Sequence, residues 1–252
     1  MRHRSLLLAA AFLLAASPAP AQAPRGATLA VQAVAPTPDG RARVTECSGV
    51  LIAPDLVLTA GHCLDLISSP AQVAAFAYDG PRPVPRPLAV AAFARHPDHV
   101  VGWRARAGAP ETRQREIAAD LALLRLAAPA SGVTPARLGP PPDAGTQAAT
   151  LSGTGPPAAG ARGGLLKRLP LTAFRLSSGT GATIAFASAR GTVCGGDSGG
   201  PLAITGPEGE RVWAIAVAVL RPASGCGGRF AAALVDPASP GFARMRSNLA
   251  AP

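Results

Sequence analysis

The chain has 252 residues, including 28 glycines and 27 prolines, and a net charge of +10 at pH 7. This length is enough for one large β domain or two small domains. The positive charge is almost all arginine, with Lys167 as the single lysine, and it is scattered along the chain. We therefore expect a basic, solvated surface and exclude a nucleic-acid groove. Glycine and proline separate short apolar runs, and long helical periodicity is scarce, which favours β-strands and loops.

The first 21 residues have the pattern of a secretory signal peptide. Arg2 and Arg4 precede an apolar run at residues 6–16, and Ala19 and Ala21 form a small-x-small cleavage site. A membrane anchor is the alternative, but the run is shorter than the about 20 residues that span a bilayer. We expect cleavage after Ala21 and a protein secreted to the periplasm or the medium, without a membrane anchor. Loss of the two arginines lowers its charge to +8.

The rest of the chain reads as two sets of short strands. A turn at residues 36–40 predicts a hairpin between the first two strands, and prolines at 81–87 predict a stiff loop. The strands are predicted at residues 27–34, 43–52, 56–60, 88–93 and 120–126, and then at 147–152, 169–176, 182–188, 202–205, 212–220 and 230–235.

A segment rich in proline, alanine and glycine at residues 127–144 predicts an extended connector between two halves of similar size. The pattern contains no strand–helix–strand rhythm. It therefore predicts an all-β fold of two antiparallel barrels, with residues 22–135 in the first and 136–252 in the second.

The sequence CGGDSGGP at residues 194–201 surrounds Ser198 with the backbone that acyl transfer requires. A serine hydroxyl is a weak nucleophile, so it needs a base for its proton and donors for the oxyanion that follows attack. Gly196 has no Cβ, so the chain can turn tightly and aim its N–H at the same point as that of Ser198. This motif predicts a nucleophile with its own oxyanion hole.

Three histidines remain after signal removal, and His62 is the candidate base. It ends a predicted strand in the sequence TAGHC at residues 59–63, whereas His96 and His99 lie in a charged loop and are expected to be solvated surface residues. Asp120 is the candidate acid, because the apolar run after it would bury its carboxylate behind a histidine, and Asp98 is its rival.

The four cysteines predict two disulfides in an exported chain, and their positions alone allow three pairings. A metal site is the alternative reading, but the Cys-x-x-Cys spacing is absent.

Three separated motifs together resemble the trypsin/chymotrypsin family of serine endopeptidases, in a secreted bacterial form. They are TAGHC at 59–63, DLALL at 120–124 and GDSGGP at 196–201, and CSGVLI at 47–52 also resembles the family's strand before the histidine. Their order differs from that in subtilisins and α/β-hydrolases. The resemblance spans most of residues 27–236. It implies two six-stranded antiparallel β-barrels with the active site in the cleft between them.

The resemblance also implies the role of each catalytic residue. His62 acts as general base and then general acid, Asp120 orients its ring, and Ser198 is the nucleophile, with the N–H groups of Gly196 and Ser198 as oxyanion hole. The protein is then a serine endopeptidase that forms an acyl-enzyme. The alternatives are a catalytically idle cationic binding protein on the same scaffold and an esterase-like hydrolase with the same triad.

The resemblance pairs Cys47 with Cys63, and Cys194 with Cys226. It implies no cofactor and no metal, a protein or peptide substrate, and a monomer.

The substrate pocket departs from the best-known family pattern. The residue at its base, six before the nucleophile, is Thr192, followed by Val193. Since Thr192 is not an acid, a preference for arginine or lysine is not expected, and a small or medium neutral side chain is our first prediction. The second is an acidic side chain selected by Arg221 or Arg229.

Activation also departs from the family pattern. The family's zymogens are cut before an Ile-Val-Gly-Gly type end, whose ammonium pairs with the aspartate beside the nucleophile, and no such string is present here. We expect activity directly after signal removal, with Asp197 satisfied by another group.

Overall fold

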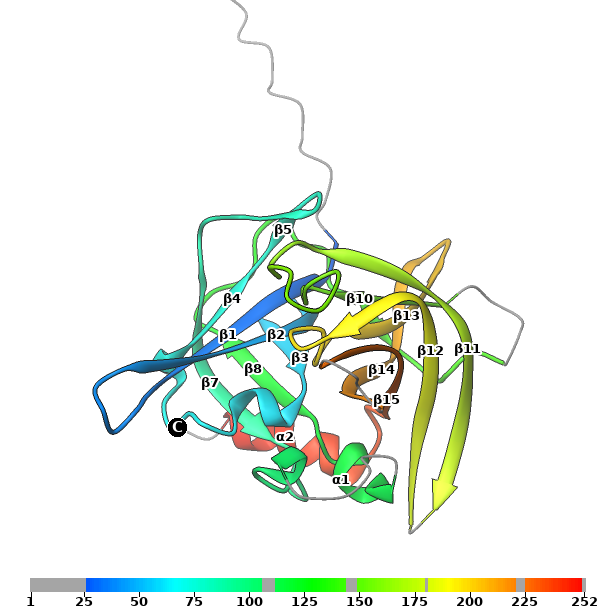
Figure 1. The fold of residues 1–252 in the computed structure, drawn as a ribbon. Helices are drawn as coiled ribbons and strands as arrows, with labels where there is room; N and C mark the ends of the chain where they lie inside the picture. Colours follow the sequence, from blue (N-terminus) through cyan, green and yellow to red (C-terminus); the bar gives the residue numbers. More distant parts are fainter. Residues whose placement is uncertain (1–25, 106–111, 144–148, 180, 221–224, 251–252) are drawn as a thin grey trace, which may run out of the picture.

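The computed structural model describes residues 26–105, 112–143, 149–179, 181–220 and 225–250 (Figure 1). The expected signal peptide and Arg221 lie outside these residues. Two β-barrels lie side by side, the N-terminal one drawn in blue to green and the C-terminal one in yellow-green to orange. This arrangement confirms the predicted all-β fold. No helix of the described residues is long and apolar enough to cross a membrane.

The first barrel closes with six antiparallel strands in the order β1-β2-β3-β8-β7-β4. Aliphatic side chains on both faces of its strands are completely buried, among them Leu29, Leu51, Leu58, Leu123 and Leu124. The predicted hairpin at 36–40 is confirmed by the antiparallel register of β1 and β2. The strands are β1 (Thr28–Pro36), β2 (Ala42–Ala53), β3 (Leu56–Thr59), β4 (Val73–Phe76), β7 (Leu88–Arg95) and β8 (Ala122–Leu126).

The sequence pattern missed three short strands of this region. They are β4 and the small hairpin of β5 (Tyr78–Asp79) and β6 (Arg82–Pro83), which falls partly in the predicted proline loop. Short 3-10 turns are also present: η1 (Gly61–Leu64), η2 (Pro70–Gln72) and η3 (Trp103–Ala105).

The second barrel has six antiparallel strands in the order β13-β10-β11-β12-β15-β14 and closes through the pairing of β13 with β14. A short seventh strand, β9 (Arg137–Leu138), adds to β14 in parallel. Trp213 and Phe230 are fully buried inside this barrel. The strands are β10 (Ala149–Gly153), β11 (Lys167–Gly179), β12 (Ala182–Cys194), β13 (Pro201–Gly206), β14 (Gly209–Val219) and β15 (Cys226–Leu234).

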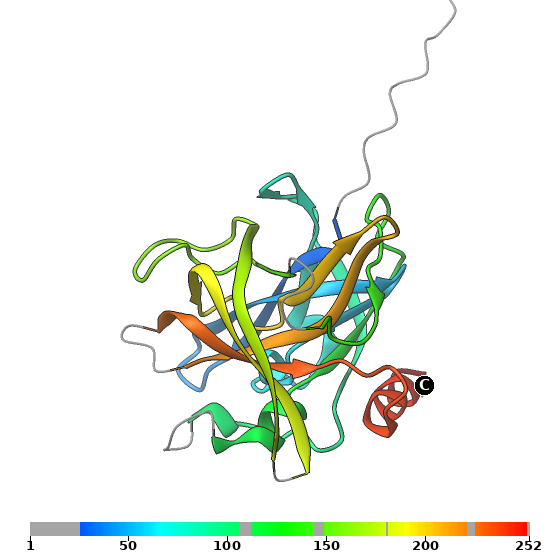
Figure 2. The ribbon, with the colours of Figure 1, turned by 90° about the vertical axis from the view of Figure 1, so that its right-hand side faces the viewer.

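The two halves are joined by a shared core and by two helices, each of which packs against the barrel of the other half. Leu124 of β8 belongs to the same buried apolar cluster as Ile184 and Ile215 of the second barrel. The C-terminal helix α2 (Pro240–Ala250) follows the second barrel but contacts β7 and β8 of the first, and α1 (Gln114–Ala118) contacts β12 and β15 (Figures 1 and 2). These contacts fix the position of one barrel relative to the other.

Helix α2 is an element that the sequence pattern did not predict. Ser239 and Pro240 form a helix start, since the Ser239 hydroxyl accepts a hydrogen bond from the Phe242 N–H at 3.3 Å and proline is favoured in the first turn. Phe242, Met245 and Leu249 are the buried residues of its apolar face. Their helical spacing was the signal that could have revealed this element.

Both expected disulfides are present. Cys47 of β2 is bonded to Cys63 beside His62, and Cys194 at the end of β12 is bonded to Cys226 at the start of β15. The pairing that the family resemblance implied is therefore confirmed. Potential ligand atoms of His62, Cys47 and Cys63 lie within 4.8 Å of one another, close enough to share a metal ion. The two sulfurs form the disulfide, however, and offer no thiolate.

Candidate active site

His62 is held at the point where β3 gives way to the turn η1. Its ring Nδ1 lies 2.6 Å from Oδ2 of Asp120, and its backbone N–H donates to Oδ1 of the same carboxylate at 2.7 Å. Because Nδ1 faces an anion, it carries the proton, and Nε2 is left as the acceptor. One carboxylate thus fixes both the backbone and the ring tautomer of His62.

Asp120 lies two residues before β8, and its side chain is 0% exposed. Burial by itself raises the pKa of this carboxyl, but the imidazole and N–H groups of His62, together with His99, more than offset that effect, so the pKa of Asp120 is lowered. The rival residue Asp98 has a side chain that is 83% exposed and lies beside His96. The structure therefore brings Asp120, not Asp98, to His62.

Ser198 lies in the glycine-rich loop between β12 and β13. Gly196 has φ +96° and Gly199 has φ +83°, a backbone conformation that favours glycine. A Cβ on Gly199 would also lie 2.0 Å from the carbonyl oxygen of Ser48. Within the described part of the chain, neither the Gly196 nor the Ser198 N–H donates to a protein acceptor. These two donors are the ones that the sequence predicted for an oxyanion.

Ser48 ties this loop to the first barrel and was missed by the sequence reasoning. Its hydroxyl donates to the carbonyl of Gly196 at 2.8 Å and accepts from the Thr154 N–H at 2.9 Å. Its backbone N–H donates to the carbonyl of Ser198 at 2.7 Å. Strand β2 of one barrel therefore positions the serine loop of the other.

A guanidinium lies between the two reacting groups. Nη1 of Arg104 is 2.8 Å from Nε2 of His62 and 3.4 Å from Oγ of Ser198, while that hydroxyl donates to the carbonyl of Val217 at 3.3 Å. Arginine has no acceptor, so Arg104 donates to His62 and occupies the lone pair that would accept the serine proton. Partial desolvation lowers the pKa of Arg104, although the residue as a whole remains exposed. The expected contact between His62 and Ser198 is interrupted in this arrangement.

The expectation that His96 and His99 are solvated was wrong, and His99 joins the site. Its side chain is 1% exposed, with Nε2 2.8 Å from Oδ1 of Asp65 and Nδ1 3.3 Å from Oδ1 of Asp120. The His96 side chain is also mostly covered. His99 is buried because the loop after β7 folds back over η1, a long-range contact that local polarity does not reveal.

The positions of the residues expected to form the specificity pocket do not define a substrate preference. Val193 is buried in the apolar cluster of the second barrel, and the carbonyl of Thr192 accepts a hydrogen bond from Lys167 at 2.8 Å. Arg229 is exposed on β15. The pocket assignment therefore stays a prediction.

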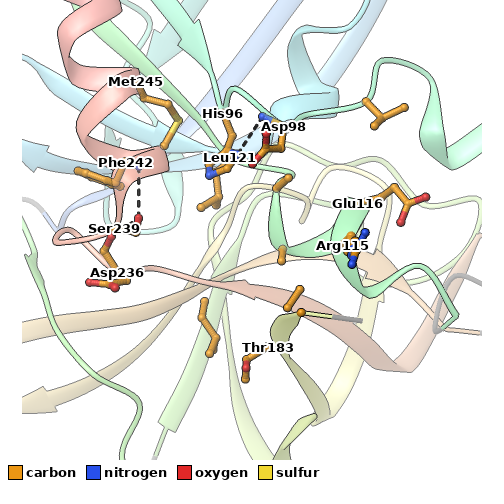
Figure 3. Close-up of a pocket in the computed structure, with 16 residues that line it drawn as sticks. His96, Asp98, Arg115, Glu116, Leu121, Thr183, Asp236, Ser239, Phe242 and Met245 are labelled. Atoms are coloured by element: carbon orange, nitrogen blue, oxygen red, sulfur yellow. Dashed lines mark hydrogen bonds and ion pairs between the residues drawn. The ribbon is translucent and has the colours of Figure 1, made fainter. Parts of the chain in front are cut away.

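A cavity of about 860 Å³ lies between α2, α1 and the loop after β7, and none of the triad residues lines it (Figure 3). Its lining includes His96, Arg115, Phe242 and Met245, but none of the residues that carry the predicted chemistry. We therefore assign the candidate site from its chemical groups and not from cavity size.

A His–Asp pair from one β-barrel facing a serine loop from a second defines the class of chymotrypsin-like double-barrel folds. A family model described as Trypsin matches residues 32–231, and the chain belongs to this family. Among solved structures, an HL collagenase is similar in fold, with a TM-score of 0.60 and 17% identity, over 82% of this chain and 87% of that one. A search of curated proteins by sequence gave no match.

Proposed function

We propose that this protein is a secreted serine endopeptidase that hydrolyses peptide bonds with His62, Asp120 and Ser198. The observation that carries the proposal is the double hydrogen bond from His62 to the buried Asp120, placed beside a serine whose loop supplies two N–H donors. Membership of the trypsin family supports the same chemistry. We expect it to act as a monomer, on protein or peptide substrates.

The steps follow from the proton positions. Ser198 Oγ attacks the peptide carbonyl while Nε2 of His62 takes its proton, and Asp120 stabilises the imidazolium that forms. The N–H groups of Gly196 and Ser198 bind the oxyanion, and loss of one such donor costs about 3 kcal/mol of transition-state stabilisation. His62 then protonates the leaving amine, and water hydrolyses the acyl-enzyme by the same route in reverse. Arg104 must leave Nε2 before the first step.

A catalytically idle cationic binding protein is the second candidate, and the position of Arg104 is the observation that favours it. A cation that fills the space between base and nucleophile is compatible with a scaffold that no longer reacts. The intact His62–Asp120 pair favours the enzyme, because a binding protein has no need of it.

Cleavage of a peptide library, read by mass spectrometry, tests the proposal. The wild type is compared with Ser198→Ala, which removes only the nucleophile, and with Arg104→Ala. We expect cleavage by the wild type and Arg104→Ala and none by Ser198→Ala, with small, medium or acidic residues before the cut bond. Absence of cleavage by both the wild type and Arg104→Ala would favour the idle binding protein.

A further inference from the structure

The aspartate beside the nucleophile is fully buried and has its own cation. The Asp197 side chain is 0% exposed, and Nζ of Lys167 lies 2.8 Å from its Oδ2. The same ammonium donates to the carbonyls of Pro156 and Thr192, each at 2.8 Å. An ammonium has three donors, so all three are used by acceptors in a site that leaves Lys167 16% exposed.

Asp197 in turn holds the backbone at the start of the serine loop and in the segment after β10. Its Oδ2 accepts from the N–H of Cys194 at 2.8 Å, and its Oδ1 accepts from the N–H of Gly155 at 2.9 Å. Cys194 begins the turn that contains Gly196 and Ser198. The carboxylate is therefore the link between the lysine and the segment that carries both oxyanion donors.

The surroundings of this carboxylate are shaped to its size. A Cβ on Gly153 would lie 2.3 Å from Oδ1 of Asp197, and one on Gly155 would lie 2.8 Å from its Cγ. These glycines belong to the Gly-Thr-Gly sequence at 153–155, a feature that the catalytic roles leave unexplained. They leave room for a carboxylate in this orientation, and a larger residue at either position would displace it.

The ammonium matters because a buried carboxylate without a cation is strongly disfavoured. Burial raises the pKa of Asp197, while Lys167 and the two N–H groups oppose that effect. If the ammonium is removed, the carboxylate must take up a proton or turn toward water. Either change weakens its bonds to Cys194 and Gly155 and releases the turn that follows.

We propose that Lys167 is a positioning residue for the oxyanion hole, whose ammonium fixes Asp197 and thereby sets the Gly196–Ser198 turn without a charge from the chain's N-terminus. This inference rests on the proposed peptidase function. Lys167 acts through Asp197 and does not touch the reacting atoms. This role explains why the chain has a lysine at this position although its other basic side chains are almost all arginines. Only an ammonium offers three donors from one compact atom.

The test replaces Lys167 with Met, which keeps the length of the side chain and removes the charge. The matched control is Arg168→Met on the same strand, because Arg168 pairs with Glu210 at the surface and not with Asp197. We expect kcat to fall about 10²-fold in Lys167→Met, as for loss of one oxyanion donor, with KM changed less than about threefold. Arg168→Met keeps both constants.

Chemical rescue separates the ammonium from a merely structural role. Lys167→Cys is alkylated with 2-bromoethylamine, which rebuilds the ammonium, or with iodoacetamide, which does not. We expect kcat to return toward that of the wild type only with 2-bromoethylamine. Equal recovery with both reagents, or equal kcat in Lys167→Met and the wild type, overturns the inference.

A second measurement needs no variant at Lys167. Extending the N-terminus of the mature wild type by a short peptide is expected to leave kcat unchanged. Activity that is lost on extension and regained on its removal would overturn the inference. If neither the mature nor the extended wild type cleaves peptides, and Arg104→Ala does not cleave them either, the proposed function has failed and not this inference.

Discussion

Arg104→Ala is the substitution that bears most directly on how the site starts a reaction. The wild-type guanidinium donates to Nε2 of His62 at 2.8 Å, so each turnover must first break this contact. A hydrogen bond that involves a charge contributes about 1.5–3 kcal/mol, and exposed pairs contribute about 1 kcal/mol or less. Arg104 is exposed as a residue, but its charge is partly desolvated. We therefore expect its hydrogen bond to His62 to contribute about 1–2 kcal/mol.

This free energy converts to a five- to thirtyfold rise in kcat/KM for Arg104→Ala. The assay is the initial rate of cleavage of a fluorogenic peptide at substrate concentrations well below KM. Arg41→Ala is the matched control, because Arg41 is an exposed arginine that pairs with Asp39 in the β1–β2 turn. A kcat/KM that is unchanged or lower in Arg104→Ala refutes the idea that this arginine obstructs the base.

Two further predictions concern the histidine–aspartate side of the site. Gly61→Ala places a Cβ 2.6 Å from Nδ1 of His99 and 3.0 Å from Oδ1 of Asp120, so we expect at least a tenfold loss of kcat and about 1–3 kcal/mol of destabilisation, measured by urea unfolding and kinetics. The pKa of Asp120 is lowered in the folded state, so its charge contributes stability above the unfolded value of about 3.9 and loses that contribution as the pH falls through the folded value. Urea titrations between pH 7 and pH 2 should show a steeper acid loss in the wild type than in Asp120→Asn, and parallel curves would contradict the assignment.

Much of the fold follows from local pattern. Eleven apolar runs between turn residues predicted strands of both barrels, and each corresponds to a strand of the structure. Helix α2 was not predicted, because its apolar face consists of only Phe242, Met245 and Leu249, within a segment otherwise rich in small and polar residues. The predicted ends of β11 and β12 also differ from those in the structure, because most of β11 is not buried and carries little apolar signal.

Some residues of the candidate site could be predicted from local sequence, and others could not. His62, Ser198 and Gly196 lie in local motifs, and the neighbouring residues in each motif indicate their chemistry. Arg104 and Lys167 do not, because Arg104 lies 42 positions from His62 and Lys167 lies 30 positions from Asp197, and only the tertiary fold brings each pair together. No local pattern marks one arginine among many as the one that reaches a catalytic histidine.

Labelling of the purified protein with a fluorophosphonate tests the central claim most directly. The reagent reports an activated serine without any assumption about substrate preference, and intact mass followed by peptide mapping locates the adduct. We predict one adduct, on Ser198, formed faster in Arg104→Ala and abolished by His62→Ala. No adduct on Ser198 even in Arg104→Ala, or an adduct that persists unchanged in His62→Ala, would contradict the account.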